Sequence, residues 1–147
     1  MFKSLFCAFF IAIAAAVCTA QGGPRADEVS TSDGRAVRAV VEAQLKALAT
    51  DDSARAFSYA SPAIKKQFRN AATFFEMVRR TYPMLIRPVA ISFFRPETGD
   101  GVITQGVQFR DREGNIWRAI YELQRQPDKS WRINGCAVTA DDDSSTT

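Results

Sequence analysis

The clearest pattern in the chain is a C-terminal series of apolar and β-branched runs separated by short polar segments. The runs cover residues 102–110, 116–126 and 131–138. The segments between them, 111–115 and 127–130, consist largely of Asp, Gly, Asn, Pro and Ser, which favour tight turns. This pattern predicts a meander of three antiparallel strands. A meander with one apolar face is stable only when another part of the chain covers that face.

The upstream half of the chain has the spacing of amphipathic helices, and we expect these to supply the cover. Apolar residues recur there at intervals of three and four, which is typical of a helix with one apolar face. The predicted helices cover residues 36–49, residues 53–60, a segment that starts at Ser61-Pro62, and a segment from a capping box at Thr73 to Tyr82. Ser32 or Asp33 is expected to cap the first helix. Pro83 ends the last one, because proline keeps the preceding residue out of helical geometry.

A fourth strand is predicted upstream of the meander, over residues 89–94, and a turn over residues 97–101 follows it. The predicted fold is therefore α+β, with N-terminal helices packed on a curved four-stranded antiparallel sheet. Gly106 and Gly135 lie inside strands, where glycine often marks a bulge or a bend. Such bends would curl the sheet into a cone with a pocket at its mouth.

Alternation along residues 116–126 separates two faces of one strand. Trp117 and Tyr121 fall on one face, and Ile120 and Glu122 fall on the other. Because both faces carry apolar residues, we expect a central strand that is partly covered on both sides.

The N-terminus has the pattern of a secretory signal peptide over residues 1–20. Lys3 supplies the positive charge, residues 5–17 form an apolar run, and Ala20 is the small residue at the cleavage site. A helix needs about 20 apolar residues to span a bilayer, and this run is shorter. No stable membrane span is therefore expected after cleavage. We therefore expect a periplasmic or secreted protein.

The remaining composition favours a single domain. Residues 21–34 are predicted to be a polar linker and residues 139–147 a disordered acidic tail, which leaves one domain over residues 35–138. Hydrophobic residues make up 46% of the chain and charged residues 24%, enough for a packed core. The net charge of +3 is spread over isolated arginines rather than a basic block, so a nucleic-acid partner is not expected.

Reactive side chains are scarce. Cleavage removes Cys7 and Cys18 and leaves Cys136, which has no partner for an internal disulfide. The chain contains no histidine, so Cys136 lacks the usual base that activates a nucleophile, and we interpret it as a buried, inert core residue. With no histidine, one remaining cysteine and scattered carboxylates, the sequence does not indicate a metal site. No motif indicates a cofactor.

Four residues are candidates for a ligand pocket: Tyr59, Trp117, Tyr121 and Glu122. The aromatic residues could line a pocket, although tyrosines of this kind are also common in cores with the hydroxyl at the rim. Glu122, if buried, would be a candidate general base with a raised pKa. The alternative is that Glu122 faces solvent and pairs with an arginine such as Arg118 or Arg132. No residue is identified as catalytic.

Several segments of the chain resemble a known family. They are VVEAQLKAL in the first helix, AFSYASPAIKKQF at Ala56–Phe68, FFEMVRRTY at Phe74–Tyr82, and Trp131-Arg132-Ile133-Asn134-Gly135-Cys136. These segments resemble a bacterial, exported family described as domain of unknown function 4864. The order of helices and strands is similar to that of the nuclear transport factor 2-like cones. The resemblance implies a cone fold and carries no established activity or catalytic residue.

Three functional hypotheses remain open. The first is a non-catalytic binding or protein-interaction module, which takes a small apolar ligand in the cone pocket or a protein partner. By analogy with the cones, a homodimer could form through the open sheet face. The second is a small isomerase or lyase that uses Glu122 or a tyrosine as acid or base. The third is a structural accessory subunit.

Overall fold

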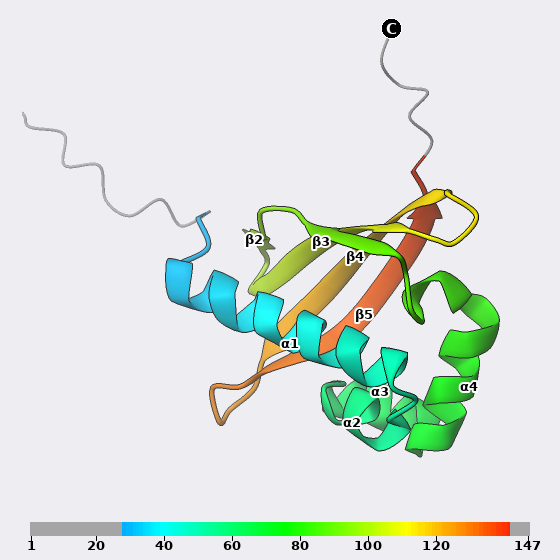
Figure 1. Cartoon of the computed structure of the whole chain (residues 1–147). Helices are drawn as coiled ribbons and strands as arrows, with labels where there is room; N and C mark the ends of the chain where they lie inside the picture. The colour runs from blue at the N-terminus through cyan, green and yellow to red at the C-terminus, as the bar shows by residue number, and fades with distance from the viewer. Residues whose placement is uncertain (1–27, 142–147) are drawn as a thin grey trace, which may run out of the picture.

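The computed structural model describes residues 28–141, which form helices on one face of an antiparallel sheet (Figure 1). The helices are α1 (Thr31–Ala49), α2 (Ser53–Ser58), α3 (Pro62–Phe68), α4 (Ala71–Thr81) and a short 3₁₀ helix, η1 (Pro83–Leu85). The strands are β1 (Ala90–Phe93), β2 (Glu97–Gly99), β3 (Val102–Arg110), β4 (Ile116–Arg125) and β5 (Trp131–Ala140). The predicted α+β class is therefore confirmed. The predicted signal peptide, residues 1–20, lies outside the described residues, as do residues 142–147 of the predicted disordered tail. Residues 31–34 of the predicted linker belong to α1, and residues 139–140 of the predicted tail belong to β5.

The first and last α-helices begin earlier than the sequence predicts. Ser30, rather than Ser32 or Asp33, caps α1, and its hydroxyl accepts a hydrogen bond from the Asp33 amide at 3.1 Å. Asn70 caps α4 in the same way, with its side-chain oxygen 2.8 Å from the Thr73 amide. In both cases the cap is a polar residue upstream of the predicted one. Its side chain bonds to the amide three residues further along, which is the usual geometry of a helix N-cap. No helix within residues 28–141 combines the length and the apolar composition needed to cross a membrane.

The connection between α2 and α3 pairs with the edge of the sheet. Ser61 caps α3 as predicted, with Pro62 in the first turn. The helix α2 stops at Ser58, two residues earlier than predicted, because the next residues bond to β5. The Ile133 amide donates to the Tyr59 carbonyl and the Ser61 amide donates to the Ile133 carbonyl, both at 2.8 Å. The backbone of this connection is thereby fixed on β5.

The sheet has five strands, in the order β1-β3-β4-β5, with β2 also paired to β3. The sequence predicts four, because it interprets residues 97–101 as a turn, whereas residues 97–99 form β2. Both β1 and β2 pair with the same edge of β3, and the strand pairing is interrupted between them near Pro96. The Gln105 side-chain amide donates to the Phe94 carbonyl at 2.8 Å, so it satisfies a backbone group inside this break.

The two strand glycines behave differently. The register places Glu122 opposite Gly135 and Leu123 opposite Ile133, which leaves Asn134 as the extra residue of a β-bulge. The bulge expected near Gly135 is therefore confirmed. No register shift occurs at Gly106. A Cβ atom there would lie 3.0 Å from the Phe94 ring, so glycine is needed for the close approach of that ring.

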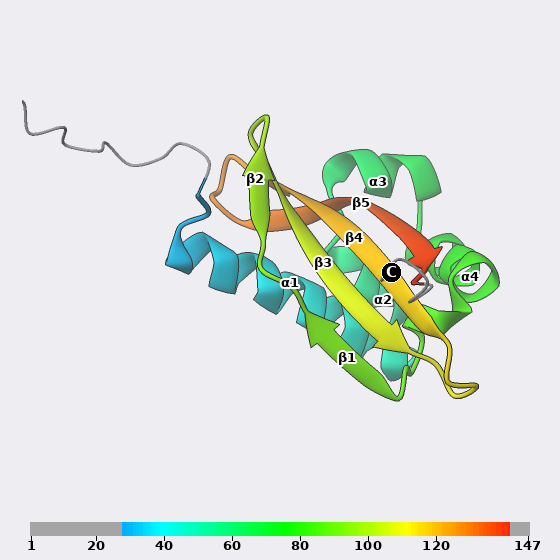
Figure 2. The same cartoon turned by 90° about the horizontal axis from the view of Figure 1, so that it is seen from above.

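The core lies between the helices and the inner face of the sheet. The apolar stripe of α1 packs on alternate residues of β3 and β4, and Val37, Val41, Val107, Phe109 and Leu123 have no exposed surface. Burial of a side chain of this size contributes about 1.5–3 kcal/mol to the free energy of folding. The opposite, outer face of the sheet is not covered by any helix of the described chain (Figure 2). The prediction that β4 is central is confirmed, but only its inner face is covered there.

Candidate functional site

A mostly apolar hollow lies between the helices and the inner face of β4 and β5. This inner cavity has a volume of about 510 Å³. Its walls come from α1, α3, α4 and the two strands, with Leu48, Ile64, Phe74 and Val78 among the apolar side chains that line it. Its size is within the range of small-molecule pockets, which are concave and mostly apolar.

Phe68 and Phe74 line the inner cavity, and Phe57 packs against Phe74 behind them. The Phe74 ring lies 5.4 Å from that of Phe57 in a tilted arrangement and 5.6 Å from that of Phe68 in an edge-to-face arrangement. These separations are favourable for aromatic pairs. Helices α2, α3 and α4 therefore meet around the Phe74 ring.

Tyr121 borders the inner cavity with a hydroxyl that has no hydrogen-bond partner. Alternation along β4 directs its side chain to the inner face, where the residue is 1% exposed. Within residues 28–141 no group meets the distance and angle of a hydrogen bond with the hydroxyl, although the Cys136 thiol lies close enough to affect its pKa. Burial, followed by the nearby Cys136, raises the pKa of Tyr121 well above its usual range, so the group stays protonated. A buried polar group without a partner is destabilising, which makes this hydroxyl an exception that calls for an explanation.

Cys136 faces Tyr121 across the β4–β5 pair and also lines the inner cavity. Burial raises the pKa of its thiol to about 12, although the Tyr121 hydroxyl acts in the opposite direction. A thiol that remains protonated is a poor nucleophile. The side chain is partly rather than fully buried, and it packs against the core. The interpretation of Cys136 as an unreactive residue is consistent with its pKa.

Two of the segments that resemble the family, the motifs at Ala56–Phe68 and Trp131–Cys136, meet in the structure. The Ser61 hydroxyl donates to the Asn134 side-chain oxygen at 2.8 Å, and it also accepts from the Ile64 amide. The Asn134 amide group donates to Glu122 at 3.1 Å. This junction of Ser61, Asn134 and Glu122 anchors the α2–α3 connection at the bulge of β5. Ser61 and Asn134 therefore have a structural role. The Ser61 hydroxyl bonds to an amide oxygen and not to a base that would activate it as a nucleophile.

The structure does not bring the four predicted pocket residues together. Tyr121 lines the inner cavity, and Tyr59 is half-buried with its backbone bonded to β5. Trp117 lines a separate hollow of about 360 Å³ near η1 and the β3–β4 turn. Its indole donates to Asp111 at 2.9 Å, and this bond lowers the pKa of the Asp111 carboxyl.

Glu122 lies on the outer face of β4, on the opposite side of the strand from Tyr121. Its hydrogen-bond partner is Asn134, whereas the sequence suggested an arginine such as Arg118 or Arg132. Arg118 instead pairs with Asp141, at 3.1 Å. Glu122 is thus separated from the inner cavity by the sheet itself.

Gln44, which is not among the predicted pocket residues, is 4% exposed and lines the inner cavity from α1. Its amide nitrogen donates to the Ala56 carbonyl at 3.2 Å, which fixes the orientation of the side chain. A signal for this residue was present in the sequence. Gln44 occupies a position on the apolar stripe of α1, between Val41 and Leu48, where an apolar residue is expected.

The sequence matches the family model of the domain of unknown function DUF4864 over residues 30–146. The match begins at the cap of α1 and extends past the end of β5, and it includes both motifs of the junction. The resemblance to that family is therefore confirmed. No curated protein and no solved structure matches the chain.

Proposed function

Since this chain belongs to the family described as a domain of unknown function, DUF4864, whose name assigns no activity, we propose a function from the inner cavity. The protein is a small, non-catalytic binding module that takes a mostly apolar ligand there. The observation that carries this proposal is the buried Tyr121 hydroxyl, which has no partner within residues 28–141 and borders an apolar cavity of about 510 Å³. A bound ligand with a polar group would complete the missing hydrogen bond.

The chemistry of the cavity supports binding rather than acid–base catalysis. A general acid or base works best with a pKa near the operating pH. The raised pKa values of Tyr121 and Cys136 keep both groups protonated near neutral pH. Glu122, the acid or base of the isomerase or lyase hypothesis, lies across the sheet from the cavity.

The proposal is tested by a thermal-shift screen of the protein against small apolar and amphipathic molecules. A ligand at a hundredfold excess over its dissociation constant stabilises the folded state by about 2.7 kcal/mol. At least one class of apolar molecule should raise the melting temperature in this way. If a broad library gives no shift, the binding proposal is wrong.

A matched pair of variants places the binding in the inner cavity. Ile64 lines the cavity from α3, whereas its neighbour Ala63 is exposed and does not line it. Ile64→Trp fills part of the volume and should weaken the binding of any hit at least tenfold. Ala63→Trp adds the same side chain to the solvent face of the helix and should leave binding unchanged. Equal effects of the two variants would show that the ligand binds elsewhere.

The outer face of the sheet favours a second function, which is self-association. Phe94 and Ile120 lie next to each other around Gly106 on this uncovered face, and they are 42% and 44% exposed. We propose that this outer patch, Phe94 with Ile120, forms the contact of a homodimer. Ile120→Lys should then shift the sedimentation coefficient to that of a monomer, while Val89→Lys, at an exposed apolar residue before β1, should not. A monomeric wild-type protein at high micromolar concentration would rule this out.

We also propose that the protein is exported. The signal pattern of residues 1–20 supports this, and it predicts a mature chain that begins at Gln21. The intact mass of protein from a periplasmic extract of a bacterial host tests it. A retained N-terminus, or a lipid attached to Cys18, would contradict it.

The finer description of the fold is likewise a proposal. The order of four α-helices before the sheet, and the bulge that bends β5, support a cone of the nuclear transport factor 2-like type. An experimental structure of the protein would test whether the helices close the mouth of a curved sheet.

A further inference from the structure

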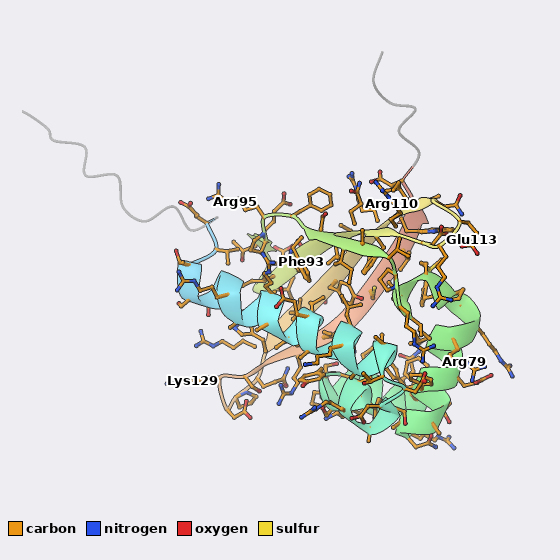
Figure 3. All side chains as sticks on the ribbon, viewed as in Figure 1. Arg79, Phe93, Arg95, Arg110, Glu113 and Lys129 are labelled. Atoms are coloured by element: carbon orange, nitrogen blue, oxygen red, sulfur yellow. The ribbon has the colours of Figure 1, made fainter. Side chains whose placement is uncertain are left out.

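The inner cavity differs from other hollows of the molecule in its charge. None of the described side chains that line it belongs to Asp, Glu, Lys or Arg. Four further hollows of the described residues each contain at least one arginine, such as Arg87, Arg95 or Arg118. In Figure 3 the labelled charged side chains, among them Arg79, point away from the body of the molecule. The charge of this basic protein is therefore kept out of the inner cavity.

An uncharged lining restricts the ligand. An ionised group that enters a low-dielectric site loses its hydration, and the loss is offset only by a nearby opposite charge or by several hydrogen bonds. The inner cavity provides no such charge. A carboxylate or an ammonium group would therefore bind there much more weakly than a neutral group of the same size.

Five side chains with a hydroxyl or amide group nevertheless line the cavity, those of Gln44, Gln67, Thr81, Tyr82 and Tyr121, and among them only Gln44 and Tyr121 are buried. The Tyr121 hydroxyl is protonated and has no partner in the described chain, so it can donate one hydrogen bond. The Gln44 amide uses its nitrogen for the Ala56 carbonyl, which leaves the side-chain oxygen as an acceptor. Tyr121 comes from β4 and Gln44 from α1, and both line the same cavity. A ligand that satisfies both must accept one hydrogen bond and donate another.

We infer that the inner cavity selects an uncharged, mostly apolar molecule whose polar end is a hydroxyl group, and that it discriminates against the corresponding carboxylate. A hydroxyl group can accept a hydrogen bond, as the Tyr121 donor requires, and can donate one, as the Gln44 oxygen requires, whereas an ether only accepts. The inference rests on the proposed function, because it specifies which ligand the same cavity takes. Alcohols with a long or cyclic hydrocarbon part meet these requirements.

The test is a matched series of three probes, measured by isothermal titration calorimetry at pH 7.5 with the wild-type protein. The probes are 1-decanol, methyl nonyl ether and decanoate, which share a similar chain and differ in the polar end. Decanol should bind at least tenfold more tightly than decanoate and several-fold more tightly than the ether. Decanoate that binds as tightly as decanol would overturn the inference and leave the proposed function intact. Failure of all three probes to bind would overturn both.

Two tyrosine variants assign the polar contact. Tyr121→Phe removes the donor at the cavity and should weaken decanol binding about threefold to tenfold. Tyr59→Phe removes a hydroxyl from a residue that does not line the cavity, and it should leave the affinity unchanged. Thermal unfolding of each variant shows that it is folded. An unchanged affinity for decanol in folded Tyr121→Phe would overturn the role of the Tyr121 hydroxyl.

Discussion

Tyr121 and Glu122 are neighbours on β4, and their side chains lie in opposite environments. The Glu122 carboxylate, on the outer face, accepts a hydrogen bond from Asn134 at 3.1 Å. The Tyr121 hydroxyl, on the inner face, has no partner within residues 28–141. Glu122, which the sequence suggests as a possible base, thus has a hydrogen-bond partner, whereas the Tyr121 hydroxyl has none in the described chain. On this strand the apolar face holds the stronger indication of a binding site.

The two faces also differ in how their apolar residues are used. On the inner face, Ala119 and Leu123 have no exposed surface. On the outer face of the same strand, Ile120 is 44% exposed and lies beside Phe94. The inner residues therefore hold the domain together, while the outer patch is available for a contact with another molecule.

The largest expected difference between the faces concerns the reactivity of a thiol. Cys136 has a pKa of about 12, against an ordinary value of 9.0, so its thiolate fraction at pH 8 is reduced by about a thousandfold. Alkylation by iodoacetamide, followed at the peptide that contains Cys136, should be slower in the folded than in the unfolded protein by a similar factor. The control is Cys136→Ala combined with Ala137→Cys, which moves the thiol to the exposed neighbour. Rapid alkylation of native Cys136 would contradict the pKa.

The same pKa makes stability depend on pH. Above about pH 9 the thiol ionises in the unfolded chain but stays protonated in the folded one up to about pH 12. The unfolded state then binds fewer protons, so the free energy of unfolding should fall as the pH rises through this window. Urea titrations between pH 8 and pH 11 measure the slope. Cys136→Ala should make it shallower, and an unchanged slope would assign the effect to other groups.

Truncation of one apolar residue on each face tests which face holds the core. Leu123→Ala removes a fully buried side chain and should lower the free energy of unfolding by about 2–5 kcal/mol. Ile120→Ala, on the outer face, should lower it by less than about 1 kcal/mol, because that side chain is largely solvated in the monomer. Denaturant titration measures both. Equal losses at low protein concentration would mean that the outer face is also covered.

The junction of the two motifs should matter for stability to a smaller extent. Ser61→Ala removes the cap of α3 and the donor to Asn134, so the free energy of unfolding should fall by about 1–3 kcal/mol. Ser58→Ala is the matched control, because its hydroxyl makes only an exposed bond to the Arg55 carbonyl. That change should stay within about 0.5 kcal/mol. If the two variants are equally stable, the junction is not what fixes the α2–α3 connection.

The smallest effect is expected at Glu122. Glu122→Gln keeps an oxygen that accepts from Asn134 and removes only the charge, so stability should change by less than about 0.5 kcal/mol. Binding of any ligand in the inner cavity should be unchanged, because Glu122 lies across the sheet from it. A loss of ligand affinity in this variant would place the binding site on the outer face instead.

Local patterns were sufficient to predict most elements of this protein. The meander, the α3 start at Ser61-Pro62 and the end of α4 before Pro83 follow from residues close together in the sequence. Turn residues, capping side chains and the apolar period act within a few positions, so they can be interpreted without knowledge of the fold. The inward direction of Tyr121 also follows from the period of two along its strand.

Other features depend on contacts that no local pattern contains. Ser61 bonds to Asn134 across 73 positions, and Gln105 fills the break that divides the edge strand into β1 and β2. The inner cavity is likewise formed by residues of α1, α3, α4, β4 and β5, which approach one another only after packing. The sequence alone determined that Tyr121 lies on an apolar face. Only the tertiary structure decided that its hydroxyl has no hydrogen-bond partner within residues 28–141, because the distances between distant segments are set by how the helices pack on the sheet.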